Sequence, residues 1–277
     1  MTVTETLIGL GTVLALLTRA YEKLEAFMTG QVLVPLRRPP ANGNGNGNGT
    51  MKEGGYQERD ELFRMYRLKR YLSPQIAKKV LECPDEDCLW ESHRREITVV
   101  FLDLRGFTTF ADSAEPEEVM ALLRSYHAEM GRLIFKFEGT LERFTGDGIM
   151  VFFNDPVACD DHTVKAIRMA LEMQDRAKDL RTGWLKKGYE LDLGIGLAAG
   201  YATVGNIGFE GRMDYGVVGK VTNLAHRLCE EARGGQILTN QKTLSKIEES
   251  VEAEPLEKLH LKGFRCPVDA FNIVGCR

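Results

Sequence analysis

The sequence RFTGDGIMVFF runs from Arg143 to Phe153 and is the clearest structural pattern in the chain. At its centre Asp147 stands between two glycines, which readily adopt the positive φ angles of a tight turn. An apolar run follows the turn. The pattern predicts a β-hairpin with strands at Gly139–Phe144 and Ile149–Phe153 and with Asp147 at its tip.

Strands and helices alternate around this hairpin. The apolar run ITVVFL, at Ile97–Leu102, predicts a buried strand that ends just before Asp103. Further elements are expected at Glu115–Phe137 and Asp160–Leu180 (helices), Leu191–Gly200, Thr203–Ile207 and Tyr215–Val218 (strands), Val221–Ala232 (helix), and Gln236–Thr239 and Ala270–Val274 (strands). The order β-α-β-β-α-β with additions predicts an α+β fold, in which a ferredoxin-like (palm-like) sheet carries helices on one face.

Two aspartates are expected to meet at one edge of this sheet. Asp103 follows the first strand and Asp147 lies at the hairpin tip, and these strands are neighbours in a ferredoxin-like sheet. Each aspartate alone is typical of a helix cap or a turn. Together they favour a site for Mg²⁺ ions that bridge phosphate oxygens. The backbone amides of Phe107 and Thr108 offer further donors to phosphate.

The composition excludes several broad classes of protein. The 277 residues carry 36 basic and 40 acidic side chains, and the resulting net charge of −4 argues against general nucleic-acid binding. A composition that is 43% hydrophobic and 27% charged is ordinary for a globular protein. The six cysteines include no CxxC pair, so we expect free thiols in a reducing cytoplasm.

Residues 1–30 form an apolar segment with heptad spacing. Apolar residues recur at alternating spacings of three and four from Leu7 to Met28, which predicts a helix that pairs with another helix. The uncharged run Thr6–Thr18 is shorter than the roughly 20 residues that span a bilayer. Contact with a membrane surface and packing on the following domain are alternatives to dimerisation. We expect a cytoplasmic protein, with membrane association through this helix as the alternative.

Two further segments precede the main domain. We expect residues 31–55 to form a flexible linker. Prolines end the helical pattern, and the repeated Asn-Gly from Asn42 to Gly49 cannot form a buried core. Residues 56–95 predict a helical lead-in, in which Ser73 and Pro74 begin a helix at Gln75–Glu82. This lead-in either packs on the next domain or transmits a signal to it.

Four motifs resemble those of one enzyme family, the class III nucleotidyl cyclases. They are FLDLRGFT (Phe101–Thr108), RFTGDGIMVFF (Arg143–Phe153), VGKVTNLAHR (Val218–Arg227) and the tripeptide Leu261-Lys262-Gly263. The resemblance covers residues 96–274 and implies a catalytic domain at 96–277. It also implies that ATP or GTP is converted to the 3′,5′-cyclic monophosphate and pyrophosphate. The family works as a head-to-tail dimer with active sites at the interface.

The resemblance assigns metal and transition-state roles to particular residues. Asp103 and Asp147 match the two metal-binding aspartates, and the carbonyl of Leu104 is an additional ligand for two Mg²⁺ or Mn²⁺ ions. Asn223 and Arg227, four apart on a predicted helix, match the ribose-orienting Asn and the transition-state Arg that the other protomer supplies.

Further basic residues match phosphate-binding positions. Lys262 matches the lysine that binds the triphosphate. Arg212, in the loop before the strand at Tyr215–Val218, is a second phosphate candidate.

Two positions in the expected base pocket depart from the family pattern. Arg143 stands where adenylate cyclases carry Lys and guanylate cyclases Glu, and Gly216 stands where the family has Asp or Thr for adenine, or Cys for guanine. Arginine only donates hydrogen bonds. Adenine N1 accepts, whereas N1–H and N2–H₂ of guanine donate, so ATP is favoured over GTP. A guanylate cyclase or a mixed ATP/GTP cyclase is the alternative, and an inactive nucleotide-sensing pseudocyclase is a third reading, against which the intact motifs count.

Overall fold

The structure is a computed structural model that describes residues 71–82, 91–209 and 212–277. The chain divides into two units, Met1–Leu72 and Ser73–Arg277, and all the named helices and strands belong to the second. The expected heptad helix at 1–30, the linker at 31–55 and the first part of the lead-in lie outside the described residues. None of the helices in the described ranges is long and apolar enough to cross a membrane.

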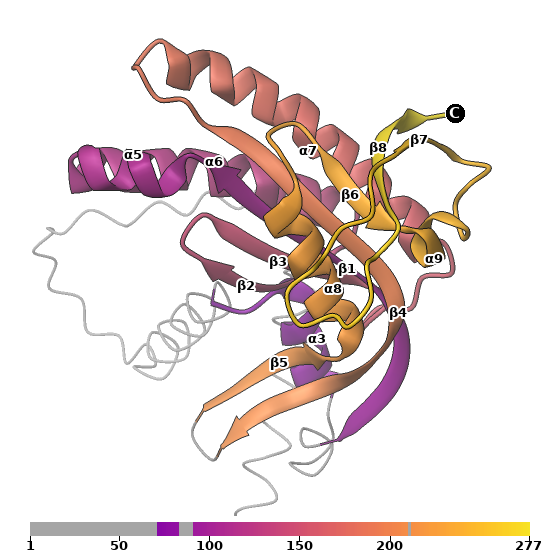
Figure 1. Ribbon diagram of the computed structural model, residues 1–277. Helices are drawn as coiled ribbons and strands as arrows, with labels where there is room; N and C mark the ends of the chain where they lie inside the picture. The colour runs from indigo at the N-terminus through magenta and orange to yellow at the C-terminus, as the bar shows by residue number, and fades with distance from the viewer. Residues whose placement is uncertain (1–70, 83–90, 210–211) are drawn as a thin grey trace, which may run out of the picture. The chain divides into compact units, whose positions relative to one another are not determined.

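One mixed sheet organises the second unit (Figure 1). Its hydrogen-bonded order is β2-β3-β1-β4-β6-β8-β7, and β5 pairs with β4 beside this path. The strands are β1 (Ser92–Arg105), β2 (Thr140–Thr145), β3 (Gly148–Phe153), β4 (Asp192–Phe209), β5 (Arg212–Val218), β6 (Ile237–Asn240), β7 (Val251–Pro255) and β8 (Ala270–Cys276). The helices are α3 (Pro74–Glu82), α5 (Phe107–Ser113), α6 (Pro116–Lys136), α7 (His162–Leu185), α8 (Lys220–Glu231) and α9 (Gln241–Leu244).

Helices cover both faces of this sheet, because the central strand β1 is apolar on both sides. Val100, Leu102 and Leu104 belong to the core that includes α6 and α7. Ile97 and Val99 belong to a second core, to which α3 and α8 contribute. Successive side chains of a strand point to opposite faces, so one apolar run supports both layers. The α+β class is confirmed, whereas the expectation of helices on a single face was wrong.

The predicted hairpin is present, with Gly146 and Asp147 as the two turn residues between β2 and β3. Gly146 has a φ of 65°, the left-handed value expected at the first position of such a turn. The hairpin pairs with β1, where Leu102 lies opposite Ile149. This pairing brings the hairpin tip to the end of β1.

Three other predictions need correction. The two strands expected at Leu191–Gly200 and Thr203–Ile207 are one continuous strand, β4, in which Gly200 pairs with Ile97 without a break. Strand β1 begins at Ser92, inside the expected lead-in, and continues through Asp103 to Arg105. Helix α9 and strand β7 were not predicted at all. The lead-in helix, by contrast, is confirmed as α3, with the Ser73 hydroxyl accepting a 3.3 Å hydrogen bond from the Ile76 amide.

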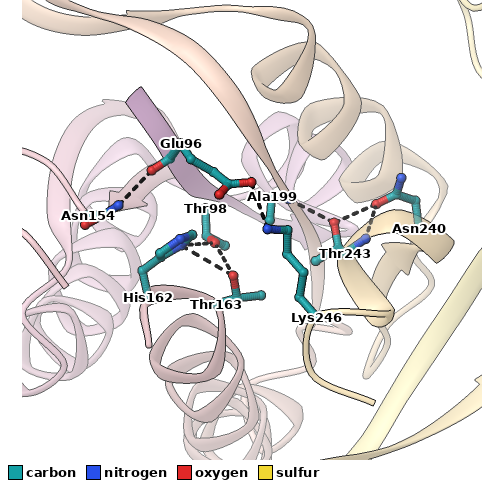
Figure 2. Close-up of polar contacts among 9 residues, drawn as sticks. All are labelled: Glu96, Thr98, Asn154, His162, Thr163, Ala199, Asn240, Thr243 and Lys246. Atoms are coloured by element: carbon teal, nitrogen blue, oxygen red, sulfur yellow. Dashed lines mark hydrogen bonds and ion pairs between the residues drawn. The ribbon is translucent and has the colours of Figure 1, made fainter. Parts of the chain in front are cut away.

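Buried polar contacts join β1 to the helices at one end of the sheet (Figure 2). The fully buried Thr98 hydroxyl lies 2.7 Å from His162 Nδ1 and 2.9 Å from the Thr163 hydroxyl, both in the first turn of α7. Lys246, just beyond α9, donates a 2.8 Å hydrogen bond to the Glu96 carboxylate. The contacts of Thr98 satisfy polar groups that would otherwise destabilise the interior, whereas the pair of Lys246 and Glu96 is partly exposed.

A second set of polar contacts, around the buried Asp155 and Tyr215, connects the lead-in helix α3 to the sheet. The carboxylate of Asp155 accepts a hydrogen bond from the Tyr215 hydroxyl and lies 2.6 Å from His93 Nε2. Lys79 of α3 donates in turn to the same Tyr215 hydroxyl over 3.0 Å. Helix α3 is therefore held against β5, the strand that also carries Gly216.

Candidate functional site

Asp103 and Asp147 meet at one edge of the sheet, where the sequence places them. Asp103 is near the end of β1, and Asp147 occupies the turn between β2 and β3. The backbone N–H of Leu104 donates a 3.1 Å hydrogen bond to Asp147 Oδ2. A Cβ added at Gly148 would lie 3.9 Å from Asp103 Oδ1, so the hairpin passes directly beside this carboxylate.

The two carboxylates influence each other electrostatically. Burial, with the negative charge of Asp103 as a second cause, raises the pKa of Asp147 to about 6. Arg105 offsets part of the charge, since its Nη1 lies 2.9 Å from Asp103 Oδ2. Two like charges held this close are stabilised by a cation between them.

The donor set at this edge fits a hard divalent cation. Mg²⁺ prefers oxygen ligands and usually takes one or two carboxylates from the protein, with waters and substrate phosphates as the rest. Asp103, Asp147 and the carbonyl of Leu104 are donors of this kind. No group of three or more His, Cys, Asp or Glu side chains in the described ranges is arranged to hold a metal ion.

Arg105 is a site residue that the sequence reasoning passed over. Besides its ion pair with Asp103, its Nη2 donates to the carbonyl of Cys229 over 2.5 Å and so joins β1 to α8. Its Nε is buried and has no hydrogen-bond partner among the described residues. The residue stands inside the quoted motif FLDLRGFT, and its position two after Asp103 was the available signal.

Gly106 allows the chain to leave β1 and begin α5 within one residue. Its φ is 83°, and a Cβ there would lie 2.5 Å from the carbonyl oxygen of Glu190. The next two residues, Phe107 and Thr108, form the first turn of α5, where backbone N–H groups have no partner within the helix. The Phe107 ring packs against the core and Thr108 is exposed.

Helix α8 presents Asn223 and Arg227 on its outer side. Val221, Ala225 and Leu228 are buried on the opposite side, against the sheet. Asn223 is exposed, and Arg227 forms an ion pair with Glu230. Within the described part of the chain no hydrogen bond or ion pair connects either residue with Asp103 or Asp147.

A cavity of about 280 Å³ separates the carboxylate edge from α8. Asp103 and Gly148 line one wall, and His226 and Glu230 of α8 line another. The His226 ring packs edge-on against Phe101, with centroids 5.0 Å apart.

Arg143 and Gly216 are brought together through a residue that the sequence reasoning missed, Glu142. Arg143 is exposed and forms an ion pair with Glu142, which raises the pKa of the guanidinium. A Cβ added at Gly216 would lie 3.2 Å from Glu142 Oε1. The position next to Arg143 was the signal that could have pointed to Glu142.

Arg212 and Lys262 are the two phosphate candidates. In the described part of the chain, neither forms a hydrogen bond or ion pair with Asp103, Asp147 or Arg143. Arg212, at the start of β5, is exposed and forms a 2.9 Å ion pair with Asp214. Lys262 is exposed in a turn that follows the buried Leu261. Gly263 completes that turn with a φ of 85°.

The comparisons with known proteins agree with this architecture. The adenylate and guanylate cyclase catalytic domain family matches residues 90–275. The chain therefore belongs to this family, the class III nucleotidyl cyclases that its motifs resemble.

Two similar proteins are bacterial adenylate cyclases. Adenylate cyclase 1 of Rhizobium meliloti is 30% identical over 185 residues, which make up 66% of this chain and 28% of that protein. The adenylate cyclase of Anabaena cylindrica is 33% identical over 136 residues, 48% of this chain and 27% of the relative. The chain thus spans only a fraction of the length of these relatives.

Solved structures of an adenylyl cyclase and of a guanylyl cyclase are also similar to this chain. The crystal structure of the adenylyl cyclase CyaB from P. aeruginosa is 37% identical, covers 68% of this chain and 97% of its own, and gives a TM-score of 0.65. A crystal structure of a guanylyl cyclase is 35% identical, covers 67% of this chain and 95% of its own, and gives a TM-score of 0.62. Together the comparisons define a nucleotidyl cyclase catalytic domain.

Proposed function

We propose that this chain is an adenylate cyclase that forms 3′,5′-cyclic AMP and pyrophosphate from ATP at the interface of a homodimer. The observation that carries the proposal is the pair of carboxylates, Asp103 and Asp147, held together at the sheet edge by the Leu104 amide. The adenylate cyclases among the similar proteins support the choice of reaction.

The carboxylate pair would hold two Mg²⁺ or Mn²⁺ ions. Asp103, Asp147 and the Leu104 carbonyl are the ligands from this chain. When bound, such ions activate the ribose 3′-hydroxyl for attack on the α-phosphate and neutralise the triphosphate. The hydrogen bond from Leu104 keeps Asp147 oriented, and Arg105 keeps Asp103 in position.

A second copy of the chain would complete each site. Asn223 and Arg227 lie on the outer side of α8 and have no contact with the carboxylates of their own chain within the described ranges. From the partner, Asn223 would orient the ribose and Arg227 would stabilise the charge that develops on the α-phosphate. For this role Arg227 would exchange its ion pair with Glu230 for the phosphate.

Backbone amides and exposed cations would bind the triphosphate. The amides of Phe107 and Thr108, in the first turn of α5, suit phosphate oxygens. Lys262 and Arg212 would add positive charge. A few placed cations are sufficient for an anionic nucleotide, so a chain of net charge −4 needs no general basic surface and no nucleic-acid partner.

Arg143 favours ATP, because its guanidinium donates to the accepting N1 of adenine and cannot accept from guanine N1–H. A guanylate or mixed ATP/GTP cyclase is the second candidate, since Gly216 provides no side chain and a guanylyl cyclase structure is 35% identical. The protein would act in the cytoplasm. Residues 1–30 would supply dimer contacts or an attachment to the membrane.

The test is a turnover assay of the purified chain with ATP and with GTP, each with Mg²⁺ and with Mn²⁺, followed by chromatography of the cyclic product. Cyclic AMP formed at a kcat/KM at least about tenfold above that for cyclic GMP supports the proposal. A preference for GTP would establish the second candidate, and the absence of both products would leave only a nucleotide-binding role.

A further inference from the structure

Glu142 is a buried carboxylate in a place that the base pocket would use. Its side chain is only 2% exposed, whereas that of its neighbour Arg143 is 62% exposed. Both guanidinium nitrogens Nε and Nη2 of Arg143 donate to the two carboxylate oxygens of Glu142. An exposed cation is therefore anchored on a buried anion.

A β-bulge gives Glu142 its unusual direction. The register between β2 and β3 shifts between Leu141 and Arg143, so Glu142 is the extra residue and has no partner in the ladder. Bulges of this kind re-aim a side chain relative to regular alternation along a strand. The side chains of Glu142 and Arg143 therefore lie together, although the two residues are adjacent along the strand.

The carboxylate of Glu142 lies directly over Gly216. A Cβ at Gly216 would be 3.2 Å from Glu142 Oε1 and 3.1 Å from Ile207 Cδ1. Glu142 comes from β2 and Gly216 from β5, two strands that do not pair with each other. The carboxylate thus occupies the space into which a longer side chain at position 216 would extend.

An acceptor next to a donor matches the polar edge of adenine. The exocyclic amino group of adenine donates hydrogen bonds, and the neighbouring N1 accepts one. A carboxylate only accepts and a guanidinium only donates, so Glu142 and Arg143 form the complementary pair. Guanine reverses this order, with an accepting O6 beside a donating N1–H.

We propose that Glu142 is the residue that recognises the adenine amino group, in place of the side chain that Gly216 lacks. The inference rests on the proposed nucleotide cyclase function and adds a specificity-determining residue to it. In the bound state Arg143 turns from Glu142 toward N1, and the carboxylate is left to accept from the amino group.

Substitution of Glu142 tests this role through the ratio of the two substrates. For Glu142→Ala we expect kcat/KM with ATP to fall about 10- to 100-fold, the range for a lost hydrogen bond to a charged group, while kcat/KM with GTP changes less than about threefold. Glu142→Gln keeps the size of the side chain and an accepting amide oxygen, so its ATP-to-GTP ratio should fall less than that of Glu142→Ala. Glu172→Ala, which breaks the surface ion pair with Lys136, is the matched control and should leave the ratio unchanged.

A second variant supplies a hydrogen-bond acceptor from position 216 of β5 in place of Glu142. In the Glu142→Ala background the carboxylate that faces position 216 is gone, and the tight contact that remains is with Ile207 Cδ1, the movable end of a side chain. Gly216→Asp should then restore at least about tenfold of the lost ATP preference. In the wild-type background the same substitution places two carboxylates against each other and should lower activity with both nucleotides. Thermal unfolding of each variant checks that the domain remains folded.

The outcomes separate this inference from the proposed function. An active Glu142→Ala enzyme with an unchanged ATP-to-GTP ratio would overturn the role of Glu142 and leave the cyclase intact. If the wild type forms no cyclic product, calorimetric titration with ATP and GTP in Ca²⁺ measures the preference directly. ATP binding that weakens in Glu142→Ala then supports the role while the cyclase proposal fails, and equal binding by both proteins would overturn both.

Discussion

The Leu104 amide donates a 3.1 Å hydrogen bond to the carboxylate of Asp147. The residue next to Asp103 in β1 therefore orients the aspartate at the hairpin tip. The two carboxylates are held as one unit although 43 positions separate Leu104 from Asp147 in the sequence. This hydrogen bond places the two carboxylates of Asp103 and Asp147 at the centre of the proposed chemistry.

Removal of either carboxylate should abolish turnover and preserve the fold. We expect Asp103→Asn and Asp147→Asn to lower kcat by at least about 100-fold in Mg²⁺ and in Mn²⁺, because each removes a metal ligand. Asp160→Asn, at an exposed aspartate, is the control. Circular dichroism and thermal unfolding verify folding, and either site variant retaining activity within a few-fold of wild type would refute the metal assignment.

Helix α8 should depend on close contact with β4 at Gly196. A Cβ at this glycine would lie 2.1 Å from the Cys229 amide nitrogen and 2.3 Å from the Ala225 carbonyl oxygen. We expect Gly196→Ala to destabilise the domain by about 1–3 kcal/mol or more and to reduce activity by displacing α8. Chemical denaturation measures the first effect and the cyclase assay the second.

Gly131→Ala is the matched comparison for this substitution. Gly131 lies in α6 with nothing within 4 Å of an added Cβ, so alanine should stabilise the domain by about 0.5–1 kcal/mol. Equal effects of alanine at both positions would show that the contact between α8 and β4 is looser than described.

Much of the fold follows from local sequence pattern. The hairpin, α6, α7 and α8 are predictable because turn glycines and apolar stripes lie within a few residues of each other. The continuity of β4 was not predictable, since Gly200 is held in the strand by its pairing with Ile97, about a hundred residues earlier. The second helical layer likewise depends on which face of β1 each distant helix covers.

In the candidate site too, residues within local patterns were predictable, and residues positioned by distant parts of the chain were not. Asp103 and Asp147 were found because each stands at the end of a recognisable pattern and the strand order joins them. Glu142 was not found, because a bulge aims its side chain and Gly216 reaches it only through the folding of β5. Arg105 was passed over because its partner, the Cys229 carbonyl, belongs to a helix far along the chain.

His162 should contribute a loss of stability in mild acid. Burial lowers the pKa of this histidine, which is 7% exposed and lies 2.7 Å from the Thr98 hydroxyl. Below about pH 6.5 the unfolded chain takes up a proton that the folded chain resists, so the free energy of unfolding falls, by at most about 1.4 kcal/mol per pH unit for one group. Above this pH the contribution is complete.

His162→Gln should reduce this pH dependence. Urea denaturation between pH 5 and 8 gives the slopes. A residual slope is expected from His127, whose pKa burial also lowers, and from Asp147, whose raised pKa contributes in the opposite direction. An unchanged slope in His162→Gln would mean that His162 does not resist protonation in the folded domain.

Complementation between two inactive variants tests whether two copies of the chain form each cyclase site. Asp103→Ala lacks a metal ligand and Arg227→Ala lacks the transition-state cation, and in a mixed dimer both losses fall on one site. The other site is intact, so equal mixtures should recover about a quarter of wild-type activity, since half the dimers are mixed and each has one working site. Asp103→Ala mixed with Asp147→Ala should recover none, because every site then lacks a metal ligand. Cyclic AMP formation restored in the first mixture and absent in the second is the predicted result, and no recovery in confirmed mixed dimers would contradict the shared site.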